Sequence, residues 1–146
     1  MKFEHAFIQH CKYYAPKSMR IAIFIVFFWF GILKVLSLSP AEALVQNLFE
    51  QTIPFMEFPT FLILFGALEM LIGILFLIPK ATRIVIPLLG LHMATTALPL
   101  IILPEVSWSA PFVPTLVGQY IVKNVVIIAG AISIAGSMQI KQKTSS

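Results

Sequence analysis

At 146 residues the chain has the length of one domain, and its composition is 59% hydrophobic and only 11% charged. Soluble domains carry about 25% charged residues, so this composition excludes an ordinary water-soluble protein. The net charge of +4 does not indicate nucleic-acid binding, because the basic residues stand at the edges of apolar runs or inside them. The single cysteine, Cys11, excludes an internal disulfide and a CxxC thiol relay.

The chain begins with a short amphipathic segment at residues 1–17. Apolar Phe3, Phe7, Cys11 and Tyr14 recur there at helical spacing, opposite polar side chains. This pattern predicts a short helix that lies on the cytoplasmic face of the membrane, outside the main bundle.

Four apolar stretches follow within residues 18–137. Each is near the ~20 residues that cross a ~30 Å hydrocarbon core, and only helices do so without stranding backbone polar groups in lipid. The predicted fold class is all-α, an integral membrane four-helix bundle with short interfacial helices at the N-terminus and in the first outer loop. The expected spans are residues 20–38, 59–78, 82–103 and 115–137, with a cytoplasmic tail at residues 138–146.

The first apolar stretch also has a rival interpretation as a cleaved signal peptide. The sequence Ala41-Glu42-Ala43 fits an A-x-A cleavage site. However, the apolar region begins too late and runs too long for a signal peptide, so we prefer a transmembrane helix.

Two loops have a structure of their own. The first outer loop opens with Ser39-Pro40-Ala41-Glu42, a capping box with proline at the first helical position, which predicts a second interfacial helix on the outer surface. The third loop carries three prolines and Trp108. It is expected to form an ordered, non-helical cap with the tryptophan at the headgroup level.

The basic residues predict the orientation. Lysines and arginines precede the first span, flank the turn at residues 79–82 and follow the last span, whereas the first and third loops contain only glutamates as charged residues. The positive-inside rule therefore places both termini on the cytoplasmic side of the cell membrane. The flanking basic residues are Lys2, Lys12, Lys17, Arg20, Lys80, Arg83, Lys141 and Lys143.

Four residues are out of place in hydrocarbon: Lys34, Glu69, His92 and Lys123. Each charge at a span centre costs about 2.5–3.5 kcal/mol on insertion scales. The three charges together approach ~10 kcal/mol, which is comparable with the net stability of a whole domain. We therefore expect these side chains to face inward and to satisfy one another.

The register of the spans supports such a cluster. Glu69 lies ten residues before the turn at residues 79–82 and His92 ten residues after it, so both should lie roughly 15 Å from that turn. Lys34 and Lys123 should lie roughly 6 and 12 Å below the outer surface. The polar residues expected to complete the network are Gln119, Thr95, Thr96 and Asn124.

Glycines and prolines in the spans predict how the helices pack around this cluster. Small residues let neighbouring helices approach closely, and Pro87 and Pro99 are expected to bend the third span and free backbone carbonyls. His5, His10 and Cys11 lack the spacing of metal ligands, so no metal site is predicted. The helix-packing glycines are Gly31, Gly66, Gly73 and Gly130.

The charge count predicts a ligand. Two lysines against one glutamate leave one positive charge in excess, which deprotonation, snorkelling or a bound anion would relieve. We hypothesise a pocket, open to the outer face, for a small anionic or strongly polarised group, and a quinone carbonyl between lysine and histidine donors fits it. Two alternatives stay open: a purely structural Lys–Glu–His network, and a transport path for a small solute or anion.

At these residues the chain resembles the DoxX-like family of small four-helix membrane proteins. The resemblance covers residues 18–137 and rests on Arg20 followed by Gly31-Ile32-Leu33-Lys34, on Gly66-Ala67-Leu68-Glu69 with Gly73, and on Lys123-Asn124.

The resemblance implies a four-helix bundle in a bacterial cytoplasmic membrane. Some relatives are linked to quinone-reducing thiosulfate oxidation or to redox-stress complexes, and more distant ones act as cargo receptors or assembly factors. The cysteine motifs of the redox-active relatives are missing here, which argues against direct thiol chemistry. The expected function is that of an accessory membrane protein serving a quinone-linked redox system or a membrane-protein partner. The sequence decides neither whether the chain is an enzyme nor whether it forms a homo-oligomer.

Overall fold

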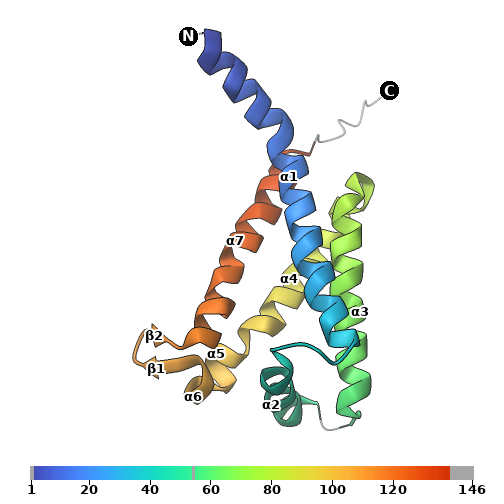
Figure 1. The fold of residues 1–146 in the computed structure, drawn as a ribbon, viewed down its shortest axis with the longest axis vertical. Coiled ribbons are helices and arrows are strands. Elements are labelled where there is room, and N and C mark those ends of the chain that lie inside the picture. Colours follow the sequence, from blue (N-terminus) through green and yellow to red (C-terminus); the bar gives the residue numbers. More distant parts are fainter. Residues whose placement is uncertain (1, 54, 139–146) are drawn as a thin grey trace, which may run out of the picture.

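The computed structural model describes residues 2–53 and 55–138, so Lys141, Lys143 and nearly all of the predicted tail lie outside the described residues. The described part is mostly helical (Figure 1). Its elements are α1 (Lys2–Val35), α2 (Glu42–Thr52), α3 (Phe58–Leu77), η1 (Pro79–Ala81), α4 (Thr82–Ala97), α5 (Pro99–Ile102), α6 (Pro104–Ser107), β1 (Trp108–Ala110), β2 (Val113–Pro114) and α7 (Leu116–Gly136).

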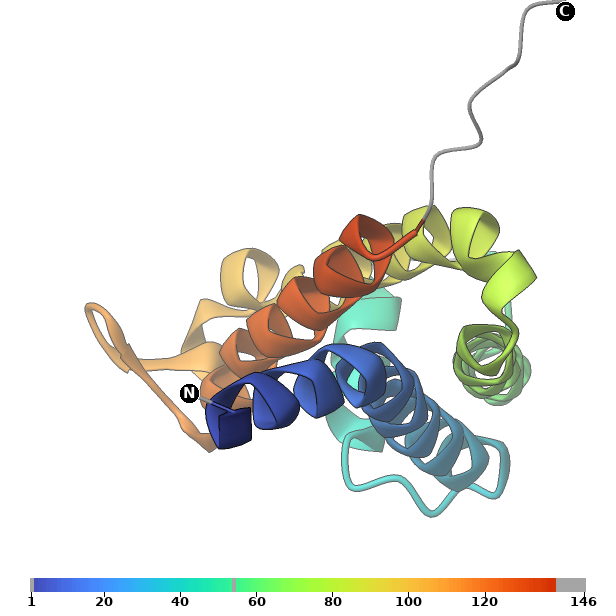
Figure 2. The ribbon, with the colours of Figure 1, turned by 90° about the horizontal axis from the view of Figure 1, so that it is seen from above.

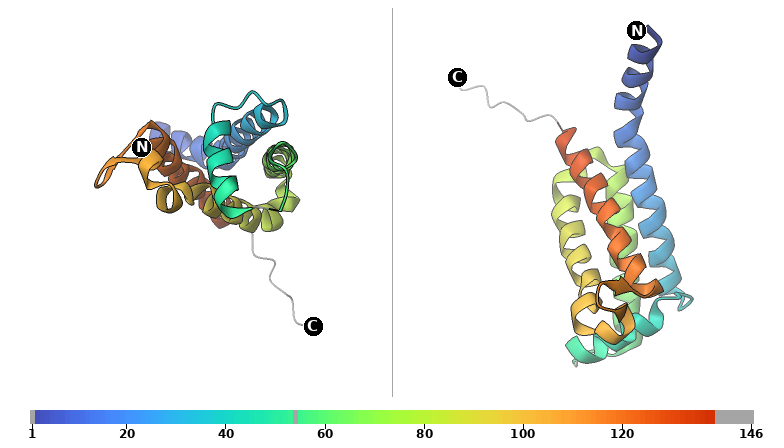
Figure 3. Two further views of the ribbon diagram at one scale, coloured as in Figure 1. Left: turned by 90° about the horizontal axis from the view of Figure 1, so that it is seen from below. Right: turned by 90° about the vertical axis from the view of Figure 1, so that its left-hand side faces the viewer.

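Four helical segments are long and apolar enough to cross a membrane: α1, α3, α7, and α4 taken together with η1 and α5. The chain is therefore a multi-pass membrane protein, as the hydropathy pattern predicts. The start of α1, the η1 turn and the end of α7 lie at one end of the molecule, and α2, α5, α6 and the β1–β2 hairpin lie at the other (Figures 1 and 3). Successive spanning segments thus run in alternate directions.

No break in the helix marks the predicted boundary between an N-terminal helix and the first span. Residues 2–35 form one continuous helix, with Pro16 inside it. Proline removes one helical hydrogen bond and crowds the preceding turn, so it bends a helix that neighbouring residues still favour. The helix changes direction in this region, and its first turns project beyond the other helices (Figures 1 and 2). That they lie on the membrane surface stays a prediction.

The helix predicted in the first outer loop is present as α2, but the capping box is not formed. Ala41 occupies the N-cap position without a side-chain hydrogen bond, and the hydroxyl of Ser39 instead accepts a bond from the Ala41 N–H at 3.3 Å. The apolar face of α2 buries Phe49, whose ring lies 4.9 Å from the Phe61 ring of α3. Helix α2 is therefore held by packing on α3.

The third loop is ordered, as predicted, but it is not free of helix. Pro104 begins the single-turn helix α6, because proline is well suited to the first turn of a helix. Two carbonyls of α5 accept side-chain bonds from the loop: the Ser107 hydroxyl donates to the Pro99 carbonyl oxygen at 2.8 Å, and the Trp108 indole N–H donates to the Leu100 carbonyl oxygen at 2.9 Å. These bonds fix the loop against α5.

The apolar core lies between the four spanning helices. Its central side chains are almost inaccessible, and α1, α3, α4 and α7 all contribute to it. The core residues are Ile23, Phe27, Ile72, Phe76, Val85, Leu89, Met93, Ala131 and Ile134.

Helices α1 and α3 approach most closely at two of the predicted glycines. A methyl group on Gly31 would lie 2.6 Å from the Gly66 carbonyl oxygen, and a methyl group on Gly66 would lie 2.6 Å from the Gly31 carbonyl oxygen. Further along the same contact, a methyl group on Gly73 would lie 3.2 Å from the Phe24 carbonyl oxygen. Only glycine permits this approach. Gly130, in contrast, meets the flexible side chain of Met19.

Arg20 joins three elements at the end of the bundle that holds the η1 turn. Its guanidinium donates to the Phe76 carbonyl oxygen at 3.0 Å and to the Thr82 hydroxyl oxygen at 2.7 Å. The Thr82 hydroxyl in turn donates to the Pro79 carbonyl oxygen at 2.7 Å. A helix C-terminus leaves its last carbonyls without backbone partners, and Arg20 of α1 satisfies one of them on α3.

Candidate functional site

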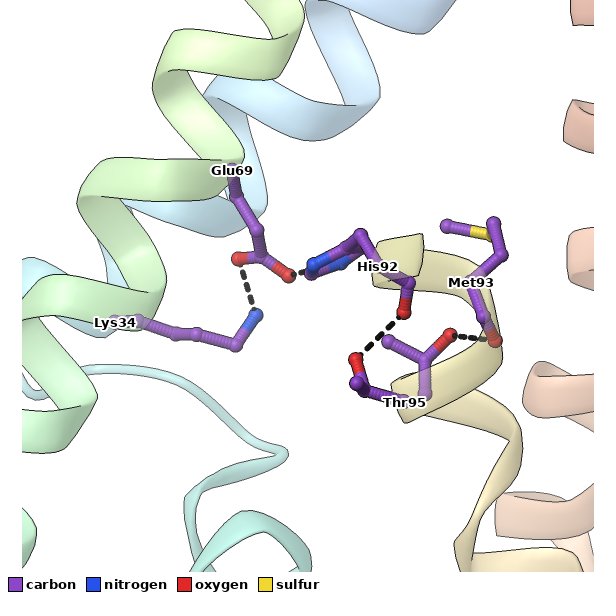
Figure 4. Close-up of polar contacts among 6 residues, drawn as sticks. Lys34, Glu69, His92, Met93 and Thr95 are labelled. Carbon is purple, nitrogen blue, oxygen red and sulfur yellow. Dashed lines mark hydrogen bonds and ion pairs between the residues drawn. The ribbon is translucent and has the colours of Figure 1, made fainter. Parts of the chain in front are cut away.

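Lys34 of α1 and Glu69 of α3 form a buried ion pair. Each residue is 6% exposed, and the Lys34 Nζ donates to a Glu69 carboxylate oxygen at 2.6 Å (Figure 4). The glycine contact described above lies one turn away on both helices, and the short spacing between the two backbones lets these side chains meet. The two charges neutralise each other.

His92 of α4 approaches the same carboxylate from the other side. It is 3% exposed, and its Nε2 lies 3.4 Å from the second Glu69 oxygen (Figure 4). This separation is slightly long for a hydrogen bond, and a small movement would close it. The two residues therefore lie at the same depth, as the short turn between their helices predicts. Glu69 bridges the lysine and the histidine.

Two aromatic rings hold the imidazole in place. The Phe65 ring stacks on His92 with centroids 5.0 Å apart, and the Phe27 ring meets it edge-on at 5.4 Å. The Phe65 ring also lies 5.6 Å from the Lys34 ammonium. The sequence analysis missed both rings, although Phe65 stands one helical turn before Glu69 and so shares its face.

One nitrogen of His92 has no partner within the part of the chain that the structure describes. Its Nδ1 is buried and accepts or donates no hydrogen bond there, whereas buried polar atoms in proteins normally have one. Because Nε2 faces a carboxylate, the neutral ring carries its proton on Nε2 and leaves a lone pair on Nδ1. In that tautomer Nδ1 can only accept a hydrogen bond, and the described residues supply no donor to it.

A cavity of about 120 Å³ lies beside Glu69 and His92. It is similar in size to an engineered cavity of about 150 Å³ that holds one benzene ring. Polar and apolar side chains share its walls, and all four spanning helices contribute to them. The lining residues are Val26, Phe27, Phe30, Glu69, His92, Met93, Thr96, Asn124 and Ile127.

A larger hollow of about 450 Å³ lies at the β1–β2 hairpin, lined by Trp108, Ser109, Ala110, Pro111 and Phe112. None of these side chains ionises, and none belongs to the buried cluster. The smaller cavity is therefore the candidate site, because it combines space for one ring with side chains that can ionise or form hydrogen bonds.

Lys123 does not join the cluster, which corrects the prediction that all four polar residues meet. Its side chain is exposed, with the ammonium 5.1 Å from the Tyr120 ring on the same helix. Helix α7 turns the next residue, Asn124, toward the cavity, and successive helical residues point about 100° apart. The cluster therefore holds one lysine and one glutamate, and the predicted excess positive charge is absent from it.

The other predicted network residues divide into two groups. Thr96 and Asn124 are half-buried and line the cavity. Gln119 and Thr95 are exposed. The Thr95 hydroxyl donates to the carbonyl oxygen of its own helix at His92, 2.7 Å away, so it steadies α4 without reaching the cavity.

Comparisons with known proteins do not identify the chain: no family model, no curated protein and no solved structure matches it. Within the described residues, no three histidine, cysteine or acidic side chains gather as metal ligands would.

Proposed function

We propose that this protein is a DoxX-like accessory protein of a bacterial cytoplasmic membrane that binds the ring of a quinone or quinol and serves a quinone-linked redox system. The observation that carries the proposal is a ring-sized cavity whose wall includes His92, a residue whose Nε2 faces Glu69 and whose buried Nδ1 has no partner among the described residues.

The charges of the site favour a neutral ligand. Lys34 and Glu69 cancel each other, so an anion would meet a buried environment without excess positive charge to offset its desolvation. A quinol hydroxyl would donate to Nδ1 of the neutral His92 ring. This charge balance gives an anion transporter less support than a quinone-binding protein.

The route to the cavity also suits a lipid-soluble molecule. Phe30 lines the cavity and is 54% exposed, while Val26 of α1 and Ile127 of α7 are half-buried. In a membrane the exposed surface of these helices faces lipid, so a ring would enter between α1 and α7 while its isoprenoid tail stayed in the bilayer. A cavity of this size takes the ring alone.

The proposed orientation follows the basic residues. The end of the bundle that holds the start of α1, the η1 turn and the end of α7 would face the cytoplasm, because Lys12, Lys17, Lys80 and Arg83 belong to it. The cavity would then be reached from the membrane, on the outer side of the apolar core.

A matched pair of threonine variants tests the proposal. Thr96→Leu fills the cavity with a larger side chain, whereas Thr95→Leu changes an exposed neighbour. We expect Thr96→Leu to weaken binding of a short-chain benzoquinol by about tenfold or more, because the leucine side chain would take part of the space that the ring needs. Thr95→Leu should bind like the wild type. The measurement is quenching of intrinsic fluorescence by the quinol in nanodiscs.

Equal affinities for the two variants, or no saturable binding by the wild type, would refute the quinone proposal. The alternative is an assembly factor or partner-binding subunit in which the cluster only joins helices. The ion pair between Lys34 and Glu69, which joins α1 to α3, favours that role.

A further inference from the structure

Lys123 is an exposed charge within a membrane-spanning helix. It stands seven residues after the first residue of α7, or roughly 10 Å along the helix axis. A lysine facing hydrocarbon at such a depth is costly and rare, and such residues usually pair with another group. Among residues 2–53 and 55–138, Lys123 forms no ion pair.

The surroundings of Lys123 form a polar patch on an otherwise apolar surface. Gln119, one turn toward the start of α7, is exposed, and the Tyr120 ring lies beneath the ammonium. A cation–π contact of this kind offsets only part of the charge. The exposed apolar residues on the same side of α7 are Leu116, two turns before Lys123, and Val126, nearly one turn after it.

We propose that this face of α7 binds a transmembrane helix of a different protein, one that carries a carboxylate at the depth of Lys123. The carboxylate would pair with the ammonium, and Gln119 would offer a further hydrogen bond. The ammonium and the carboxylate would then neutralise each other at a depth where lipid tails offer no partner to either charge.

A second copy of this chain does not fit the face. The chain has six acidic residues, all glutamates. Within the described spanning helices, Glu69 is the acidic residue that lies beyond the first helical turn. It is buried and paired with Lys34. The other five glutamates lie toward the ends of the spans. Glu4 lies at one end of the molecule, and the opposite end holds Glu42, Glu50, Glu57 and Glu105. The partner must therefore bring its own membrane-embedded acid.

The test uses two synthetic transmembrane peptides as probes. Both are polyleucine helices with one polar residue placed at the depth of Lys123, glutamate in one and glutamine in the other. Energy transfer between labelled peptide and the labelled full chain in phosphatidylcholine vesicles reports association. We expect the glutamate peptide to bind about threefold to fifteenfold more tightly than the glutamine peptide.

Three variants make the test specific. Lys123→Met should remove the preference for glutamate, Lys123→Arg should keep it, and Val126→Met, on the same exposed surface, should leave it unchanged. Equal binding of both peptides to the wild type would overturn the proposal. So would a preference that disappears once phosphatidylglycerol is added to the vesicles, because a lipid headgroup would then be the occupant of Lys123.

Discussion

Replacing Gly66 with alanine is expected to prevent α1 and α3 from packing as they do in the native protein. The new methyl group would lie 2.6 Å from the Gly31 carbonyl oxygen and 2.9 Å from the Lys34 side chain. The obstacle is backbone, which cannot rotate away as a side chain can. Overpacking of this kind costs typically 1–3 kcal/mol and occasionally more, and we expect at least the upper part of that range. The measurement is the midpoint of thermal unfolding in detergent, followed by circular dichroism.

The matched control is Gly90→Ala on α4. No atom lies within 4 Å of the position that its methyl group would take, and alanine favours a helix over glycine by up to about 1 kcal/mol. Gly90→Ala should therefore be as stable as the wild type or slightly more stable. If Gly66→Ala unfolds at the same temperature as Gly90→Ala, the close contact of α1 with α3 is wrong.

Replacing Glu69 with glutamine is expected to destabilise the protein by about 3–5 kcal/mol, because Lys34 would be left buried without a counter-charge. The same substitution at Glu105, which is exposed, should change stability by less than about 0.5 kcal/mol. Chemical unfolding in mixed micelles measures both. A small loss at Glu69 would mean that the ion pair contributes little, and that its two members reach solvent.

The double variant Lys34→Met with Glu69→Leu distinguishes two effects on stability: the loss of the ion pair, and the burial of one charge without its partner. Replacing both members of a buried pair with apolar residues of similar volume is often neutral. The double variant should therefore recover most of the stability that Glu69→Gln loses, yet bind quinol less well because His92 would lose the carboxylate that orients its ring.

Much of the fold can be predicted from hydropathy, because the spanning helices are bounded by prolines, charges and loops. The register of Glu69 and His92 is also predictable, since three residues of turn leave two antiparallel helices almost no freedom to slide. The glycine contact between α1 and α3 follows for a similar reason: Gly31 and Gly66 each stand three residues from a charge that must be buried.

The position of Lys123 could not be predicted in the same way. Every side of α7 carries apolar residues, and its polar residues do not mark the inner side, because Lys123 is exposed whereas the neighbouring Asn124 lines the cavity. The inward stripe of Asn124, Ile127, Ala131 and Ile134 is set by tertiary packing, and a rotation of one residue decides whether Lys123 or Asn124 reaches the cavity. The continuity of α1 through Pro16 is likewise a matter of context, because proline bends some helices and ends others.

The most direct test of the quinone site is nitrogen NMR of the imidazoles in lipid bilayers. The chain has three histidines, and His5 and His10, which are exposed on the first turns of α1, serve as internal references. Adding a short-chain benzoquinol should shift the Nδ1 resonance of His92 toward that of a hydrogen-bonded acceptor and leave the other two histidines unchanged. An Nδ1 resonance of His92 that stays in place while the quinol saturates the protein would contradict the proposed site.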